Sequence, residues 1–463
     1  MEAQWSYQSR ARQEAESYQS RARQEAVGKR GYTPSVHHVA VGGAGGVYLS
    51  AASDMMADSV VSVRAGQSCG ARVRAAPVVI PSGRAHSVQY EKGRPWGRRS
   101  DMSADQQQLD ELRRRIDAID DQLVALINER AKAAARIGRI KHTSGDATYA
   151  PARERGVLDR VVRANSGPLS DRTIRAIYRE LMSGSFTLER PPRVAYLGPP
   201  GSFSHLAARR KFGASVEYEP LKHIGAVFEA IEREHADLGL APVENTIGGG
   251  VIDTLDALAT RSVKICAEIN LSVQHHVLAN CPLERVERIY SKPEVFAQCQ
   301  NWLTETGMIG KTIAVASTSR AAEQAAAEPG TAAVGSELAG EIYGLRKICD
   351  RIEDDPGNLT RFLVISRESA QPTGNDKTSL FMVMSHKPGS LVEALQVLRV
   401  AGVNMTYIES RPKRGHQFEY CFFVDIEGHG DDSLTAAAIS DVGAHCSALR
   451  VLGSFPRADE VVV

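Results

Sequence analysis

The sequence of 463 residues lacks several features that would place it in a familiar class. No stretch approaches the ~18 consecutive apolar residues of a membrane-spanning helix. A formal net charge of +1 gives no general attraction to nucleic acid or to a membrane surface. Its 7 cysteines are odd in number and include no CxxC pair, which is typical of unpaired thiols in a reducing compartment. We therefore expect a cytoplasmic protein without a structural metal, and neither nucleic acid nor membrane as a partner.

Nucleotide-binding motifs are also missing. The Gly-rich turn GPPGSF, which begins at Gly198, has neither the GxxxxGK[ST] pattern of a phosphate loop nor GxGxxG followed by an acidic residue. A turn of this kind before a helix suits a carboxylate at the helix N-terminus. We expect no cofactor, and hydride transfer has no nucleotide site to support it.

The first hundred residues differ from the rest of the chain. SYQSRARQEA occurs at residues 6–15 and again at 17–26, and through Ser100 there are 14 Lys and Arg against 7 Asp and Glu. Such composition without helical or strand periodicity cannot bury a core that offsets its ordering entropy. A nucleic-acid-binding arm or a transit peptide are the alternatives. We favour a disordered leader over residues 1–101, or an initiator at Met102.

The apolar residues that follow predict a long helix packed in a bundle. Their spacing alternates between three and four residues, the heptad pattern of packed helices. A helix of about 33 residues would be about 50 Å long, too long to be covered by the chain before Pro191, so we expect a second copy to pack against it. The residues are Leu109, Leu112, Ile116, Ile119, Leu123, Leu126, Ala133, Ile137 and Ile140.

Arg130 occupies a position in this apolar seam where the spacing calls for an apolar residue. A buried guanidinium is costly unless it is paired, so a bound anion is its expected partner. Lys141, 11 residues after Arg130, lies on nearly the same helix face as Arg130. Arg113 lies about 25 Å from Arg130 along the axis and could share a small ligand with it only from an antiparallel partner chain.

The stretch LDELRRRIDAIDDQLVALINERAKAAARIGRIK, together with ARE at residues 152–154, resembles the all-helical chorismate mutase family. The resemblance implies arginines on the two substrate carboxylates, a lysine on the ether oxygen and a glutamate on the hydroxyl. In this sequence the matching residues are Arg113 (from the partner subunit), Arg130 and Arg153 for the carboxylates, Lys141 for the ether oxygen, Glu154 for the hydroxyl, and Ser185 with Glu189 as a closing polar pair.

Two residues depart from the pattern of some relatives. Ala150 stands where they have Asp, and Glu189 where they have Gln. The Claisen rearrangement that this family catalyses needs no nucleophile and no proton transfer. The protein has only to hold the substrate in its reactive conformer and to stabilise the charge that develops on the ether oxygen. To donate a hydrogen bond there, Glu189 must be protonated, which requires a raised pKa. We therefore expect mutase activity to fall as pH rises.

Beyond Pro191, strand-like runs alternate with helical stretches. This alternation predicts an α/β region with parallel sheets. The runs are residues 193–197, 237–242, 263–272, 312–316, 331–334 and 359–365.

Four segments of this region resemble prephenate dehydratase, in order and at plausible intervals. They are VAYLGPPGSFSHLAA, ADLGLAPVENTIGGGVIDTLDAL, SKPEVFAQCQNWL and NLTRFLVIS. The resemblance implies a two-lobed, periplasmic-binding-protein-like α/β domain that closes over prephenate, with the threonine of TRF essential. The matching residues are Thr360, Glu244, Asn245 and Gln298 for catalysis and Thr246 and Arg361 for substrate binding, while Lys292 stands where the family has histidine. Hydroxide leaves prephenate poorly without a proton or strong hydrogen bonds, which a polarised threonine hydroxyl can supply.

From Lys377 onward the pattern is strand, helix, strand, strand, helix, strand, the order of a ferredoxin-like α+β unit. PGSLVEALQVLRVAGVNMTYIESRPKRG resembles the phenylalanine-binding ACT domains fused to this dehydratase. A glycine permits close backbone approach, and the helix after it attracts a carboxylate. The matching effector residues are Gly389, Ser390, Leu391, Val392, Glu409, Ser410, Arg411 and Pro412.

The sequence thus predicts a multidomain chain: an all-α mutase at residues 102–191, the two-lobed dehydratase at 192–370 and an ACT domain at 376–456. We expect it to convert chorismate to prephenate and prephenate to phenylpyruvate, under inhibition by L-phenylalanine, as a homodimer or higher oligomer. Three alternatives are a dehydratase that prefers arogenate, a non-catalytic phenylalanine sensor, and a mutase–dehydrogenase. The missing dinucleotide fingerprint disfavours the last.

Overall fold

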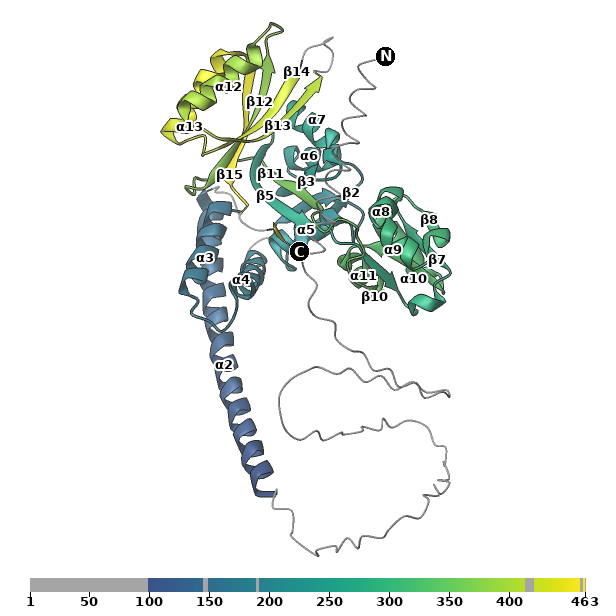
Figure 1. Cartoon of the computed structure of the whole chain (residues 1–463). Helices are drawn as coiled ribbons and strands as arrows, with labels where there is room; N and C mark the ends of the chain where they lie inside the picture. Colours follow the sequence, from purple (N-terminus) through teal and green to yellow (C-terminus); the bar gives the residue numbers. More distant parts are fainter. Residues whose placement is uncertain (1–98, 145–148, 189–190, 413–419, 459–460, 463) are drawn as a thin grey trace, which may run out of the picture. The chain divides into compact units, whose positions relative to one another are not determined.

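The computed structural model describes residues 99–144, 149–188, 191–412, 420–458 and 461–462, without the side chains of 99–103 and 141–144. The leader predicted over residues 1–101 therefore lies almost entirely outside the described residues. Three helices come first: α2 (Arg99–Ser144), α3 (Pro151–Ala164) and α4 (Asp171–Phe186) (Figure 1). The predicted long helix is confirmed and begins earlier than expected, because no Gly or Pro interrupts the chain between Arg99 and Gly138.

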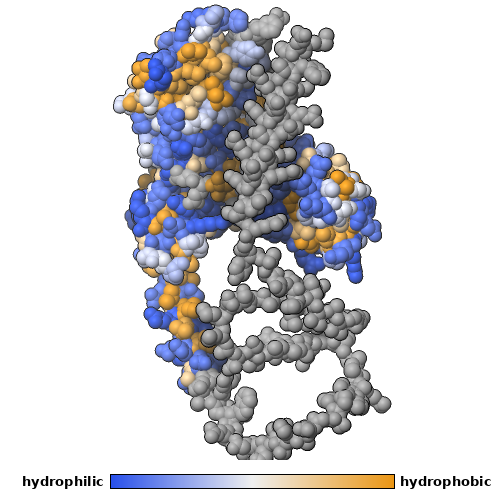
Figure 2. Space-filling view, viewed as in Figure 1, coloured by the Kyte–Doolittle hydropathy of each residue, from blue (hydrophilic) through white to orange (hydrophobic). Residues whose placement is uncertain are grey.

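The apolar seam of α2 is largely uncovered. Figure 2 shows apolar residues gathered along this helix. With 46 residues, α2 is about 69 Å long, and α4 packs against only part of it. Six seam residues have exposed fractions between 47% and 62%: Leu109, Leu112, Ile116, Ile119, Leu123 and Leu126.

Two mixed sheets form the middle of the chain (Figure 1). The first has the order β16-β5-β11-β3-β1-β2, with β4 paired to β3. Its strands are β1 (Arg193–Leu197), β2 (Glu217–Leu221), β3 (Leu238–Asn245), β4 (Gly249–Gly250), β5 (Lys264–Ser272), β11 (Leu359–Ser366) and β16 (Val461–Val462). The second has the order β10-β6-β9-β7-β8. Its strands are β6 (His276–Ala279), β7 (Arg288–Ser291), β8 (Thr312–Ala314), β9 (Thr331–Gly335) and β10 (Arg346–Cys349).

The prediction of parallel sheets is wrong in part. β1 is parallel to β2 and β3, but β11 is antiparallel to both β3 and β5, and β6 is antiparallel to β9 and β10. The reason is the path of the chain. After β5 it leaves the first sheet to build the second, and it returns as β11, which runs back between β5 and β3.

Helices cover both sheets. In the first lobe they are α5 (Phe203–Phe212), α6 (Ile224–Glu232) and α7 (Ile252–Thr260); in the second, α8 (Pro293–Gln298), α9 (Gln300–Glu305), α10 (Thr318–Ala327) and α11 (Glu337–Tyr343). Strand β11 has two differently covered faces. Phe362 and Val364 pack in the core that contains α5, whereas Leu363 and Ile365 pack in the core that contains α6 and α7.

The last part of the chain confirms the predicted βαββαβ order. Its elements are β12 (Asp376–Met384), α12 (Ser390–Ala401), β13 (Met405–Pro412), β14 (Tyr420–Glu427), α13 (Ser433–Ala444) and β15 (Cys446–Pro456). The antiparallel sheet has the order β13-β14-β12-β15. One face carries its own core. The other joins the first lobe, because Phe423 and Phe455 share a core with Leu363 and Ile365. At Gly453 the backbone of Ile265 leaves no room for a side chain.

Candidate active sites

Thr360 and Asn245 are directly opposite one another on β11 and β3. The side-chain amide of Asn245 donates to Thr360 Oγ1 over 2.9 Å. The orientation of that amide is fixed, because Asn245 Oδ1 accepts hydrogen bonds from the backbone N–H groups of Ile247 (3.0 Å) and Gly248 (2.8 Å). The Thr360 oxygen is thus an acceptor toward Asn245, which leaves its own hydrogen available for another group.

A chain of polar groups connects this pair to the second lobe. Asn245 Nδ2 also lies 2.7 Å from Asn358 Oδ1, and Asn358 Nδ2 lies 3.5 Å from Gln298 Oε1. Gln298 ends helix α8, and its Oε1 is 2.9 Å from His275 Nε2. The structure therefore brings Gln298, Asn245 and Thr360 into one network that begins in one lobe and ends in the other.

The network lies where the chain crosses between the lobes. His275 belongs to the first crossing segment and Asn358 to the second. The segments bond to one another: Ile352 N–H donates to the His275 carbonyl, and Val273 N–H to the Asn358 carbonyl, both over 2.8 Å. Any change in the angle between the lobes would act directly on the surroundings of Thr360.

Burial lowers the pKa of His275 and outweighs the opposing hydrogen bond from Gln298. The imidazole is therefore neutral near pH 7. Because it bonds to the Gln298 oxygen, its hydrogen is on Nε2. Among the described residues, Nδ1 has no hydrogen-bond partner. The sequence analysis assigned no role to His275 or Asn358. The available signal was a polar residue three positions after the predicted strand 263–272 and another directly before the predicted strand 359–365.

The remaining dehydratase residues lie in different places. Thr246 Oγ1 accepts from Leu359 N–H (3.0 Å) and holds the loop after β3 against the start of β11. Arg361 is on the other face of β11, where its Nε donates to Glu268 over 2.8 Å. Glu244 is directly opposite Arg361 on β3, so it shares this second face. Lys292 is outside the network and pairs with Glu294 at 3.6 Å. The structure does not bring the Arg361 guanidinium to the Thr360 hydroxyl.

In the helical part, Arg130 on α2 contacts Ser185 on α4. Arg130 Nη1 donates to Ser185 Oγ over 3.0 Å. Arg113 is exposed and pairs with Asp110 at 3.2 Å, and Arg153 is exposed as well. Glu154 accepts a hydrogen bond from the Tyr149 hydroxyl (2.8 Å) and lies 3.3 Å from Lys211 Nζ. Glu189 and the side chain of Lys141 lie outside the described residues.

The effector residues fall into two groups. Gly389 has φ +86°, a left-handed conformation that favours glycine, and it caps α12. In this first group Ser390 Oγ donates to the Ser385 carbonyl over 2.8 Å, Leu391 packs against the domain's own core, and Val392 is exposed. The second group is on β13, where Ser410 and Pro412 are exposed while Glu409 and Arg411 are half-buried.

Glu409 and Arg411 face the dehydratase region. A Cβ atom added to Gly250 would lie 3.3 Å from the Glu409 carboxyl carbon. Arg411 Nη2 is 3.9 Å from Asp256 on α7. Within the described residues, no group of three or more His, Cys, Asp or Glu could hold a metal ion. In that same part of the chain, no helix is both long and apolar enough to cross a membrane.

Comparison with known proteins gives three consecutive matches: chorismate mutase type II at residues 112–190, prephenate dehydratase at 194–370 and the ACT domain at 378–444. A bifunctional chorismate mutase/prephenate dehydratase of Stutzerimonas stutzeri is 40% identical over 358 residues, which cover 76% of this chain and 98% of that protein. An arogenate dehydratase/prephenate dehydratase of Arabidopsis thaliana is 38% identical and covers 57% of this chain and 72% of its own length.

Among solved structures, prephenate dehydratase of Arthrobacter aurescens in complex with L-Phe matches with a TM-score of 0.54 and 31% identity. The match covers 58% of this chain and 92% of that one. A mutase, a dehydratase and an ACT domain in this order define an enzyme of aromatic amino acid biosynthesis. The chain belongs to the bifunctional chorismate mutase/prephenate dehydratase family. The predicted enzyme class is therefore confirmed.

Proposed function

We propose that the Thr360 hydroxyl donates a hydrogen bond to the hydroxyl group that leaves prephenate. The observation that supports this role is the fixed amide of Asn245, which occupies the acceptor side of Thr360 Oγ1 and leaves the hydrogen free. In the reaction, the electrons of the breaking bond to the carboxylate become a ring double bond. The electrons of the breaking C–O bond leave with hydroxide, which gains a proton and becomes water.

Stabilising the departing oxygen is the main task of such a site, because carbon dioxide leaves unaided. Asn245 contacts Thr360 directly, and Gln298 is connected to this pair from the other lobe through Asn358, so closure of the periplasmic-binding-protein-like lobes over prephenate would complete the site. Thr246 supports the loop that carries Asn245. Glu244 lies one residue away from Asn245 and faces away from Thr360, and its part in catalysis would be indirect.

We further propose that the mutase site forms between two copies of the chain. Arg130, beside Ser185, and the partner's Arg113 would hold the two carboxylates of chorismate, with Arg153, Lys141, Glu154 and Glu189 in the roles that the family resemblance implies. The uncovered seam of α2 supports this arrangement. The protein would then be a homodimer or a higher oligomer.

L-phenylalanine is the proposed effector, bound at the residues 389–392 and 409–412 of the ACT domain. The glycine-capped start of α12 suits its carboxylate. Inhibition requires that phenylalanine favour one arrangement of the chain over another.

The test is an assay of the purified chain without added cofactor or metal. Chorismate, prephenate and arogenate are supplied separately, with and without L-phenylalanine, and the keto acid or amino acid product is measured. We expect phenylpyruvate from chorismate and from prephenate, suppressed by phenylalanine. Faster turnover of arogenate would reassign the substrate. Phenylalanine binding without turnover of any substrate would favour the sensor.

A further inference from the structure

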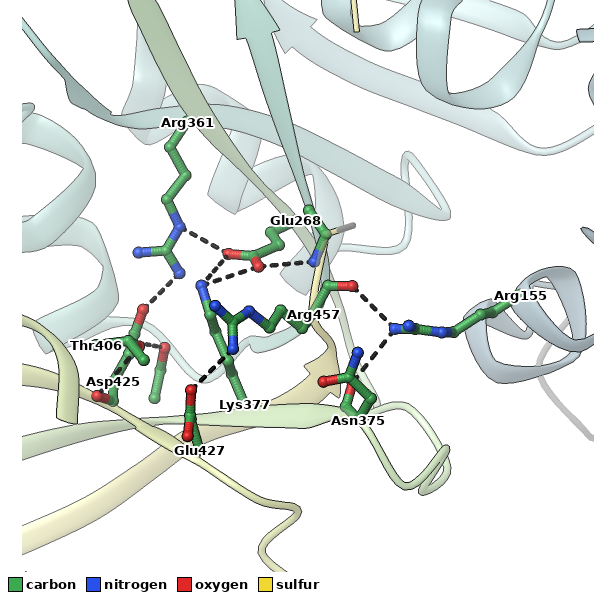
Figure 3. Close-up of polar contacts among 11 residues, drawn as sticks. Arg155, Glu268, Arg361, Asn375, Lys377, Thr406, Asp425, Glu427 and Arg457 are labelled. Atoms are coloured by element: carbon green, nitrogen blue, oxygen red, sulfur yellow. Dashed lines mark hydrogen bonds and ion pairs between the residues drawn. The ribbon is translucent and has the colours of Figure 1, made fainter. Parts of the chain in front are cut away.

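A buried cluster of four charged side chains joins the catalytic strand β11 to the ACT domain (Figure 3). Arg361 on β11 donates through Nε to Glu268 on β5 (2.8 Å) and through Nη2 to Asp425 on β14. Lys377 on β12 lies 3.0 Å from Glu268 Oε1. The side chains of Glu268 and Asp425 are 1% and 5% exposed. Two positive and two negative charges therefore meet out of solvent at the boundary between the domains.

Other hydrogen bonds hold the two carboxylates in position. The backbone N–H of Ala458 donates to Glu268 Oε1 over 2.9 Å, and the Ser379 hydroxyl donates to Asp425. Burial alone would raise the pKa of Glu268, but Arg361 and Lys377 outweigh it and hold that pKa below its ordinary value. Glu268 is therefore charged at neutral pH, and Arg361 connects one carboxylate from each domain.

The same face of the ACT sheet carries one of the two proposed effector segments. On β13, the ring of Tyr407 lies 5.6 Å from the Arg361 guanidinium carbon. Glu409 lies against Gly250, which follows the loop anchored by Asn245, and Arg411 lies near α7. A shift of β13 would therefore displace Arg361 and the loop beside Asn245 through direct contacts.

The alternation of a strand carries such a shift to the reacting groups. Thr360 and Arg361 are adjacent on β11 and point to opposite faces. Thr360 points toward the polar network that contains Asn245, and Arg361 points toward the ACT domain. We propose that Arg361 is a positioning residue, not a substrate ligand. It sets the placement of Thr360 according to the state of the ACT domain, through Asp425. This role rests on the proposed inhibition by phenylalanine.

The main test replaces the ACT end of the connection by Asp425→Asn. Arg361 keeps its bond to Glu268, so the catalytic domain retains its own half of the cluster. We expect phenylalanine still to bind, as measured by calorimetry. The ratio of prephenate turnover without and with saturating phenylalanine should fall by about fivefold or more, the range of an ordinary allosteric coupling. Asp376→Asn is the matched control, because Asp376 is an equally buried ACT carboxylate that bonds to Thr373 and Gly374 of its own segment. This control should keep the parent ratio.

A second variant, Arg361→Lys, keeps the charge but cannot reach both carboxylates with one ammonium group. A positioning role predicts a lower kcat for prephenate with an unchanged KM and weaker inhibition. A raised KM with unchanged inhibition would return Arg361 to substrate binding and overturn the proposal. A parent-like inhibition ratio in Asp425→Asn would also overturn it. A parent chain that turns over prephenate but is not inhibited by phenylalanine would refute the proposed regulation, and the coupling role with it.

Discussion

The uncovered seam of α2 makes one substitution especially informative. In an antiparallel pair that brings Arg113 of one copy to Arg130 of the other, the two-fold axis passes midway between these residues, within about two residues of Leu123. Leu123 is 48% exposed in the single chain. Leu123→Glu would place a carboxylate next to its own symmetry mate, in the middle of the proposed interface.

The expected effect is large. Burying the exposed half of a leucine contributes about 1 kcal/mol, so the loss is about 2 kcal/mol for the two copies. Desolvating two like charges adds several kcal/mol more. A total above about 4 kcal/mol raises the dissociation constant of the pair by a factor of about 1,000 or more.

Sedimentation of the variant, combined with separate assays of chorismate and prephenate, measures the consequences. We expect dissociation and loss of mutase activity. Prephenate turnover should remain, because Thr360, Asn245 and Gln298 come from one chain. Ala125→Glu introduces the same charge on the opposite side of the helix and should change neither property. A monomeric Leu123→Glu with the parent's mutase rate would refute a shared mutase site.

Three further predictions concern other parts of the chain. Asn245→Asp removes the amide donor to Thr360 and should lower kcat for prephenate by about 100-fold while mutase activity, measured on the same sample, is kept. Burial lowers the pKa of His205 to about 4, so below its unfolded pKa of about 6.5 the unfolded state binds more protons and the free energy of unfolding decreases as the pH is lowered. Urea unfolding at pH 7 and pH 5 should show a loss of up to about 2 kcal/mol that His205→Gln reduces. An equal loss in both proteins would exclude His205 as its source. Mutase activity should decline with rising pH in the parent and become flat in Glu189→Gln, whereas a flat parent profile from about pH 5 to 9 would show that Glu189 need not be protonated.

The sequence was sufficient to predict what depends on local pattern. The long helix follows from the heptad spacing between Leu109 and Ile140, and the βαββαβ order follows from alternating periodicities. The family motifs implied a catalytic role for Thr360 and for Asn245 separately. The hydrogen bond between them was not predicted, since 115 residues separate them in the chain. Their placement on facing strands depends on β11 returning antiparallel beside β3, which strand-like runs alone do not reveal.

Arg361 illustrates what a motif alone does not determine. The resemblance of TRF to the family implies substrate binding for Arg361, which follows Thr360 in the sequence. On a strand, however, neighbouring side chains point to opposite faces, and the ACT domain covers the second face. That coverage depends on a tertiary contact between segments far apart in sequence. His275 was missed for a similar reason, because its bond to Gln298 joins side chains 23 residues apart that no local pattern brings together.

The most direct test of the account compares Thr360→Val and Thr360→Ser in prephenate turnover, with mutase activity of each sample as the internal control. Valine keeps the shape of threonine without its hydroxyl, whereas serine keeps the hydroxyl beside Asn245. We expect Thr360→Val to lower kcat by about 100-fold or more, and Thr360→Ser to retain a substantial part of it. Turnover by Thr360→Val within a few-fold of the parent would contradict a role for this hydroxyl in the departure of hydroxide.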